Sequence, residues 1–361
     1  MAKTSFSAPK AADLLGWYAI HGRDLPWRSH GGRAPSPYHT WLSEIMLQQT
    51  GVITVIPYYE RFTTLWPNVE ALAAASEDDV LKEWAGLGYY SRARNLLKCA
   101  RVVASEFNGI FPEDVTVLKS LPGIGDYTAN AVRAIAYDLP ANVVDGNVER
   151  VMARIFAFEQ PINLPANKTQ IKLLAAQIAP QKQASDYAQA IMDLGATICT
   201  PRNPKCDLCP WQKNCLAFAR GMTQSLPVVQ KKPKIPQREA ISFILQDKQG
   251  RLLLRQRPTT GLLGGLWEFP CTDWNQKQEA GFTPDIPPLP TKNFAALPKP
   301  VTHVFSHFKL VMTVLVSPDT LNSQQVNDGQ WFTPDDLPAL STLTAKILRA
   351  AIPHLPIRDA G

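Results

Sequence analysis

Four of the six cysteines of this 361-residue chain lie within seventeen residues, with the spacing Cys-x6-Cys-x2-Cys-x5-Cys. Thiols gathered this closely in a cysteine-poor chain are far more often ligands of a metal or a cluster than partners in disulfides. A structural zinc site usually has two short Cys-x(2–4)-Cys pairs, whereas this segment has one. We therefore expect a 4Fe-4S cluster in preference to zinc. The expected ligands are Cys199, Cys206, Cys209 and Cys215.

The alternative for these cysteines is a pair of disulfides in a secreted domain. The first ten residues, MAKTSFSAPK, contain no apolar core of the kind that a signal peptide needs. The longest stretch without a charged residue, 45–59, is too short to cross a membrane as a helix. We therefore expect a soluble, cytoplasmic protein of bacterial type in a reducing compartment. We also expect it to be a monomer without membrane contacts.

A proline-containing turn lies between two helical stretches, residues 115–121 and 126–137. In its sequence, LPGIG, Gly123 and Gly125 let the backbone turn tightly and expose its N–H groups. At a helix N-terminus such groups, together with the helix dipole, hold an anion such as a DNA phosphate. A plain corner between two helices is the alternative. The net charge of +6 is compatible with a polyanionic partner and equally with solvated lysines.

The chain changes character after the cysteine cluster. Before it, residues such as 96–107 place apolar side chains at helical spacing, and Ser76 with Asp79 is typical of a capped helix start. After it, residues 240–245 and 252–254 flank a polar turn as in a hairpin, and 310–316 is a β-branched apolar run.

The segment between these two halves, MTQSLPVVQKKPKIPQR, is rich in proline and lysine and predicts an extended linker. A chain of this length is too long for one comfortable core, so the sequence predicts a multidomain protein. We expect an all-α domain at 1–221, the linker at 222–238 and an α+β domain at 239–361.

Several segments together carry a family resemblance. They are WLSEIMLQQT at 41–50, GLGYYSRARNL at 86–96, LPGIGDYTA at 121–129, VVDGNVERV at 143–151 and MDLGATICTPRNPKCDLCPWQKNC at 192–215. Their order and spacing resemble the helix-hairpin-helix DNA glycosylases with an iron-sulfur cluster. With the strand-rich C-terminal part, the resemblance extends over nearly the whole chain and is closest to the adenine DNA glycosylases of the MutY type. It implies base excision repair on double-stranded DNA that contains A:8-oxoguanine or A:guanine mispairs.

Two carboxyl groups fit this chemistry. Cleavage of an N-glycosidic bond develops positive charge on the sugar and negative charge on the base, so it needs an acid at the base and an anion at the sugar. Within the resemblance, Glu44 matches the carboxyl group that is peculiar to the adenine enzymes, and Asp145 matches the aspartate shared by the superfamily. Glu44 stands among apolar residues of an expected helix that begins near Ser36-Pro37, where desolvation favours the protonated acid. Asp145, in a polar Asp-Gly-Asn stretch, is expected to remain ionised and to stabilise the oxocarbenium ion.

Tyr127 occupies the position at which relatives similar to endonuclease III carry a lysine. That lysine attacks the sugar as an amine to form a Schiff base, which a phenol cannot do. The resemblance therefore implies a monofunctional glycosylase that leaves an abasic site. The Tyr127 hydroxyl is expected to order the nucleophile beside Asp145, and ordinary packing is its alternative role.

Other positions follow from the same motifs. A base inside a duplex must be flipped out before it can react, and Gln48 and Tyr89 match residues that insert into the stack. The expected adenine-pocket residues are Arg23, Trp27, Arg28 and Gln189. The expected DNA contacts include Gly123, Gly125, Arg202 and Lys205, the last two with solvated surface charge as the alternative.

The C-terminal part carries a second resemblance. Residues 264–270, GGLWEFP, and 331–334, WFTP, are similar to the Nudix fold of 8-oxo-dGTP hydrolases. The following segment lacks the carboxylate set that binds magnesium in those hydrolases, so we do not expect diphosphate hydrolysis. The resemblance implies 8-oxoguanine recognition, with Phe305, Ser306 and His307 on the matching loop. Two other functions stay open: a thymine-glycol-type glycosylase with lyase activity, and a non-catalytic iron-sulfur protein that binds DNA and senses redox state.

Overall fold

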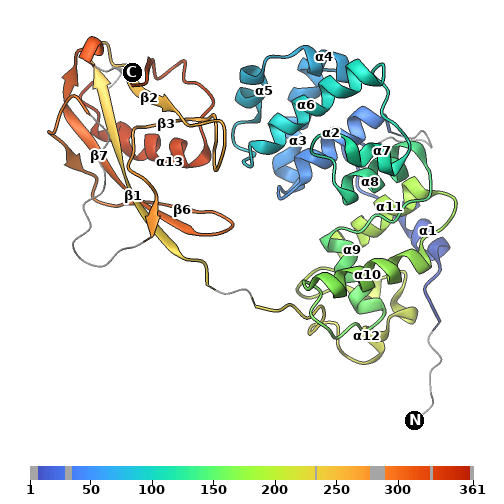
Figure 1. Cartoon of the computed structure of the whole chain (residues 1–361). Helices are drawn as coiled ribbons and strands as arrows, with labels where there is room; N and C mark the ends of the chain where they lie inside the picture. Colours follow the sequence, from blue (N-terminus) through green and yellow to red (C-terminus); the bar gives the residue numbers. More distant parts are fainter. Residues whose placement is uncertain (1–6, 29–34, 232–233, 277–288, 326–327, 358–361) are drawn as a thin grey trace. The chain divides into compact units, whose positions relative to one another are not determined.

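The computed structural model describes residues 7–28, 35–231, 234–276, 289–325 and 328–357. The chain folds into two compact units, and Figure 1 labels most of their helices and several of their strands. The first unit comprises residues 1–75 and 95–232, and the second comprises residues 76–94 and 233–361. Among the described helices, none is both long enough and apolar enough to cross a membrane.

The first unit is helical. Its elements are α1 (Ala11–His21), α2 (Pro37–Leu47), α3 (Val52–Leu65), α4 (Val69–Ala74), α7 (Val115–Ser120), α8 (Asp126–Tyr137), α9 (Gly146–Ile155), α10 (Pro165–Ile178), α11 (Ala184–Asp193), the π-helix Leu194–Ile198, two short 3-10 turns (Cys206–Leu208 and Gln212–Asn214) and α12 (Leu216–Ala219). An apolar cluster of this unit joins α1, α9, α10 and α11 around Val148, Val151 and Ile191.

Helix α2 is buried on nearly every side. Proline is favoured in the first turn of a helix, where no N–H is needed, and Pro37 stands there. Eight residues of α2 are buried, and Trp41, Leu42 and Met46 are fully inaccessible. Because α2 packs against both α3 and α8, it carries Glu44 into the interior of the unit.

Helix α5 (Glu77–Trp84) belongs to the second unit, and α6 (Ser91–Glu106) begins there and continues into the first. The Ser76 Oγ atom accepts a hydrogen bond from the Asp79 backbone N–H at 3.1 Å. The helix start expected from these two residues is therefore confirmed, because the side chain satisfies an N–H that has no partner within the helix.

The rest of the second unit is a mixed sheet covered by one helix. Its strands are β1 (Gln237–Asp247), β2 (Leu252–Gln256), β3 (Trp267–Glu268), β4 (Asn275–Gln276), β5 (Ala295–Ala296), β6 (Val301–Val304), β7 (Lys309–Leu321) and β8 (Gln330–Phe332). The main path through the sheet runs β3-β2-β1-β7-β5. Strands β1 and β7 pair in parallel, with Phe243 opposite Leu315, and the other pairs are antiparallel.

Helix α13 (Thr342–Ala351) packs on β6 and β7 and buries Leu343 and Ile347. The β1–β2 hairpin and β7 lie where the sequence predicts strands. The expected combination of an all-α part and an α+β part is therefore confirmed.

The segment 222–238, expected to be an extended linker, makes contacts with the helical unit near its start. Leu226 is 2% exposed, and its carbonyl accepts a hydrogen bond from Arg154 Nε at 3.0 Å. The Val228 carbonyl accepts another from the Ile162 N–H at 2.9 Å. Strand β1 already begins at Gln237. Proline and lysine content indicates irregular backbone, but it does not reveal that Met222, Leu226 and Val228 pack against the helical unit.

Candidate active site and cluster site

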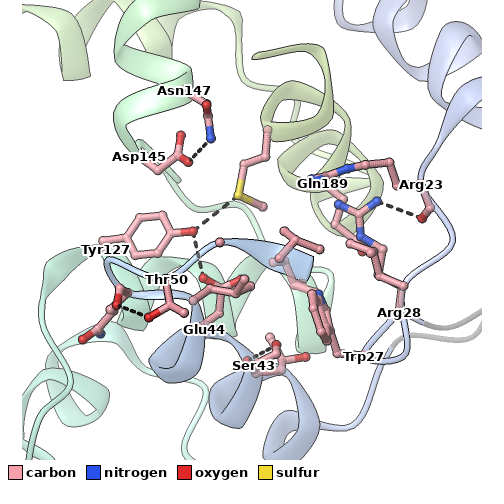
Figure 2. A pocket seen from close by; sticks show the side chains of 18 of the residues that line it. Arg23, Trp27, Arg28, Ser43, Glu44, Thr50, Tyr127, Asp145, Asn147 and Gln189 are labelled. Atoms are coloured by element: carbon pink, nitrogen blue, oxygen red, sulfur yellow. Dashed lines mark hydrogen bonds between the residues drawn. The ribbon is translucent and has the colours of Figure 1, made fainter. Parts of the chain in front are cut away.

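A cavity of about 470 Å³ lies in the helical unit, between the segment 23–28, α2, α8, the start of α9, and α11. Figure 2 shows side chains from these separate parts of the chain pointing into it. The cavity brings together eight of the residues that the sequence predicts for the site. They are Arg23, Trp27, Arg28, Glu44, Gln48, Tyr127, Asp145 and Gln189.

Glu44 lies on α2 with 6% of its surface exposed. Burial raises the pKa of its carboxyl group to about 7. The hydrogen bond from Tyr127 and the charge of Arg28 oppose this rise, and the charge of Asp145 adds to it. A carboxyl group with this pKa is substantially protonated at neutral pH, which is what a general acid requires.

The Tyr127 hydroxyl on α8 donates a hydrogen bond to Glu44 Oε2 at 2.8 Å (Figure 2). Its second contact is to Met192 Sδ at 3.3 Å. Burial, together with the charges of Glu44 and Asp145, raises the pKa of the phenol far above its ordinary value, so it remains a donor. The observed partner is thus the expected acid, Glu44, and the ordering of a nucleophile beside Asp145 stays a prediction.

Asp145 is the N-cap residue of α9. Its Oδ1 accepts a hydrogen bond from the Val148 N–H, and its Oδ2 accepts one from Asn147 Nδ2, both at 2.8 Å. The Asp145 side chain therefore caps α9 and also forms part of the cavity wall. The carboxylate is held rigidly, and its charge disfavours ionisation of Glu44.

Arg23 and Arg28 line the cavity, but both guanidinium groups bind Asp193. Arg28 forms two parallel bonds, from Nη1 to Oδ2 at 2.7 Å and from Nη2 to Oδ1 at 2.8 Å. Arg23 donates from Nε to Oδ1 at 2.7 Å. Sequence reasoning missed Asp193, because its partners lie about 170 positions away and no local pattern links them.

Trp27 and Gln189 also face the cavity (Figure 2). The Trp27 ring meets the Tyr59 ring edge to face, with centroids 5.3 Å apart. The Gln189 side chain is buried on α11 and donates to the Ser185 carbonyl at 3.3 Å. Both side chains are therefore fixed in place at the wall.

The expected DNA-contacting residues lie in several places. Gln48 lines the cavity, and its Nε2 donates to Thr128 Oγ1 at 3.4 Å. Gly123 has a φ of +77°, and a Cβ there would lie 2.8 Å from the Asn95 Cβ. Gly125 is the N-cap residue of α8. Arg202 and Lys205 are exposed on the loop between the first two cysteines of the cluster segment.

The four cysteines of the cluster segment are free and face a small cavity of about 20 Å³. Its apolar wall includes Val151, Ile155 and Leu194. Burial raises the pKa of the Cys209 thiol to about 12 and also raises those of Cys206 and Cys215, so bare thiolates are unfavourable there. Iron supplies the positive charge that stabilises them.

Within the described residues, no three His, Cys, Asp or Glu side chains converge on the position of one ion. A cubane cluster does not require such convergence, because each thiolate binds a different iron atom. The residues present therefore fit the cluster.

Two arginines that the sequence did not single out hold the cluster loop. Arg154 is 1% exposed and donates to Cys199 Sγ at 3.3 Å and to the Thr200 carbonyl at 2.7 Å. Arg150 donates to the Cys199 carbonyl at 2.8 Å and to Asn147 Oδ1 at 3.0 Å. Because Asn147 in turn binds Asp145, hydrogen bonds run continuously from the cluster loop to the cavity wall.

In the second unit, residues 305–308 form the turn between β6 and β7, closed by a hydrogen bond from the Phe305 N–H to the Phe308 carbonyl at 2.9 Å. The Phe305 ring stacks on Trp274 with centroids 5.5 Å apart, so this side chain anchors the turn. Ser306 and His307 are exposed at its tip. The Ser306 Oγ lies 3.2 Å from the Oη of Tyr89, which has a left-handed φ of +48°. Part of the segment without the Nudix carboxylates, residues 277–282, lies outside the described residues.

Comparison with known proteins agrees with this geometry. Residues 42–176 match the HhH-GPD superfamily of base excision DNA repair proteins. Residues 199–215 match the iron-sulfur binding domain of endonuclease III, and residues 241–350 match the NUDIX domain. These matches define a helix-hairpin-helix base excision repair protein with a 4Fe-4S cluster and a Nudix-like domain, and they confirm the expected cluster over zinc.

Comparison with individual relatives identifies the family within this class. The chain is 36% identical to the adenine DNA glycosylase of Rattus norvegicus, over 95% of this chain and 78% of the relative. It is 34% identical to that of Homo sapiens, over 93% of this chain and 72% of the relative. The chain belongs to the adenine DNA glycosylase family.

Among solved structures, a thermostable thymine-DNA glycosylase superposes with a TM-score of 0.52 and 30% identity, over 58% of this chain and 95% of that one.

Proposed function

We propose that this protein hydrolyses the N-glycosidic bond of adenine mispaired with 8-oxoguanine or guanine, with Glu44 as the acid and Asp145 as the stabilising anion. The observation that carries the proposal is the buried Glu44, whose pKa is about 7, in one cavity with Asp145. This is the separation of roles that the reaction needs, because one carboxyl group must be protonated while a second bears the charge.

The adenine base is flipped into the cavity, whose volume lies within the range of about 300–1,000 Å³ that is usual for small-molecule sites. Glu44 donates its proton to N7 of adenine as the bond between C1′ and N9 breaks, and the bonding electrons move into the base. Asp145 stabilises the positive charge on the sugar. Water then adds to C1′, and a carboxylate of the site takes up the proton that the water loses.

The other side chains of the cavity hold this arrangement. Tyr127 orients the Glu44 carboxyl group through its hydroxyl. Trp27, Arg28 and Gln189 form the wall against which the flipped base packs, and Gln48, which also lines the cavity, enters the DNA stack. No described lysine lines the cavity, which supports a monofunctional glycosylase over one with lyase activity.

The partner base is recognised by the second unit in this proposal. 8-Oxoguanine carries a hydrogen at N7 where guanine has an acceptor, and a hydroxyl group can accept that hydrogen bond. Ser306 is exposed at the tip of the turn, close to Tyr89, so the two hydroxyl groups form one polar surface. Arg202, Lys205 and the glycine turn at 123–125 contact phosphates.

The test uses duplexes with adenine opposite 8-oxoguanine, followed by alkali to cleave abasic sites. The wild-type protein should release adenine, and Glu44→Gln and Asp145→Asn should bind the duplex but release almost none. Near-normal excision by either variant would remove that residue from the mechanism. Borohydride should trap little covalent product with the wild type, and efficient trapping would favour the lyase alternative. A duplex with thymine in place of the adenine tests the base specificity, because its preferential cleavage would contradict the assignment.

A further inference from the structure

We propose that Asp193 is a positioning residue of the base pocket, which holds Arg28 and Arg23 against its wall and cancels part of their charge beside Glu44. The inference goes beyond the proposed function but rests on its assignment of Glu44 as the acid. Asp193 itself does not line the cavity, so it acts through the arginines.

The Asp193 carboxylate holds both arginines through several hydrogen bonds. The Asp193 side chain is completely buried, and the Arg28 side chain is 7% exposed. Asp193 accepts two bonds from Arg28, one from Arg23 Nε at 2.7 Å and one from the Arg23 backbone N–H at 2.9 Å. A paired fork of this kind fixes the plane of a guanidinium group. The Arg28 Nη1 atom also donates to the Arg23 carbonyl at 3.1 Å, which closes the loop on itself.

The position of Asp193 in the chain gives this anchor several consequences. It is the last residue of α11, directly after Met192, which contacts Tyr127. It also directly precedes the π-helix Leu194–Ile198, which leads into Cys199. π-helical turns are rare and occur frequently at functional sites. The Asp193 carboxylate therefore connects the segment 23–28 both to α11, which carries Gln189, and to the π-helix that precedes Cys199.

The charges around Glu44 show why the anchor matters for chemistry. Among the described residues, the charged groups facing Glu44 are Asp145 from the start of α9 and Arg28 from the segment 23–28, and the phenol of Tyr127 faces it from α8. Arg23 and Asp193 complete the set through their bonds to Arg28. With Glu44 protonated, two arginines and two aspartates sum to zero formal charge. Loss of the Asp193 charge leaves one excess positive charge, and loss of the Arg23 charge leaves one excess negative charge.

An excess positive charge favours the ionised form of Glu44, and an excess negative charge favours the protonated form. The reaction requires protonated Glu44, so activity falls as pH rises through its pKa. A unit charge about 10 Å away shifts a pKa by about one unit at an effective dielectric constant of about 20. Asp193→Asn should therefore move the alkaline fall in activity to lower pH, and Arg23→Gln should move it to higher pH.

The experiment measures the apparent second-order rate of adenine release against pH for the wild type, Asp193→Asn, Arg23→Gln and the double variant. The single variants should shift the midpoint of the alkaline fall in activity by about one pH unit in opposite directions. The double variant restores a formal charge of zero, so its midpoint should lie within about 0.3 pH units of the wild-type value. A fifth protein, Asp193→Glu, keeps the charge but moves the carboxylate by one methylene. It should keep the wild-type midpoint and lose at least about fivefold in rate on the acid plateau.

Iron content, measured on each variant, separates these effects from loss of the cluster. Should Asp193→Asn fail to fold, the upward shift in Arg23→Gln and the midpoint of Asp193→Glu still decide the proposal. Equal midpoints in all folded variants, or a downward shift in Arg23→Gln, would overturn it. Normal excision by Glu44→Gln would refute the assignment of Glu44 as the acid. Unchanged midpoints in variants of an enzyme that does need Glu44 would refute only the role of Asp193.

Discussion

Replacing Glu44 by glutamine should stabilise the folded protein above neutral pH while it removes activity. The pKa of this carboxyl group rises from 4.5 to about 7 on folding, chiefly because of burial. Between these two values the folded protein holds a proton that the unfolded chain has released, so stability falls as pH rises through this window. A difference of about 2.5 pH units at about 1.36 kcal/mol per unit makes the cost of ionising Glu44 about 3 kcal/mol at pH 8.

Glutamine keeps the shape of the side chain and can still accept the hydrogen bond from Tyr127, but it carries no charge at any pH. Thermal unfolding of wild type and Glu44→Gln, in matched buffers, should coincide near pH 4.5 and diverge at pH 8. At about 2–4 °C per kcal/mol for domains of 150–250 residues, the variant should melt about 6–12 °C higher at pH 8. The variant Glu60→Gln, at an exposed position on α3, controls for the loss of one carboxyl group.

A Glu44→Gln protein that is less stable than the wild type at pH 8 would refute this reasoning, because it would mean that the ionised carboxylate is well accommodated. A stabilisation of equal size at every pH would refute it as well, since packing and not ionisation would then be the cause.

Three further predictions concern Tyr127, the cluster and the second unit. Tyr127→Phe removes a hydrogen bond that favours ionised Glu44, so the alkaline fall in activity should move up by about one to two pH units, and a downward shift would contradict the assigned contact. Wild-type protein should contain about four irons per chain, and Cys206→Ala should lower both iron content and folded yield, whereas one zinc per chain would contradict the cluster. Deletion of residues 239–361 should slow excision opposite 8-oxoguanine more than opposite guanine, by about 1–3 kcal/mol in the ratio of rates, and Ser306→Ala should do so more mildly. An unchanged ratio in the truncated protein would show that the second unit does not read the partner base.

Local pattern was sufficient for features that depend on neighbouring residues. The apolar surroundings of Glu44 predicted its burial, and Ser76 predicted the start of α5. A helix cap and a buried helix face both depend on residues that are only a few positions apart. The cysteine spacing identified the cluster for the same reason.

What the sequence did not reveal depends on partners far apart in the chain. Asp193 binds arginines near the N-terminus, and Arg154 joins the cluster loop to Leu226 across 72 positions. Such pairs form only when tertiary packing brings the segments together, and no periodicity records them. The recognition role of Phe305 stays a prediction, and the stacking of its ring on Trp274 is another contact that no local pattern records.

The most direct test of the central claim is the pH dependence of adenine release by the wild-type protein. With enzyme below saturation and a duplex that holds adenine opposite 8-oxoguanine, the apparent second-order rate reports the ionisation of the free enzyme. The account predicts a rate that falls above a midpoint near pH 7 with the slope of a single proton, as buried Glu44 loses its proton. A rate that stays constant to pH 9, or rises with pH, would contradict the assignment of Glu44 as the acid.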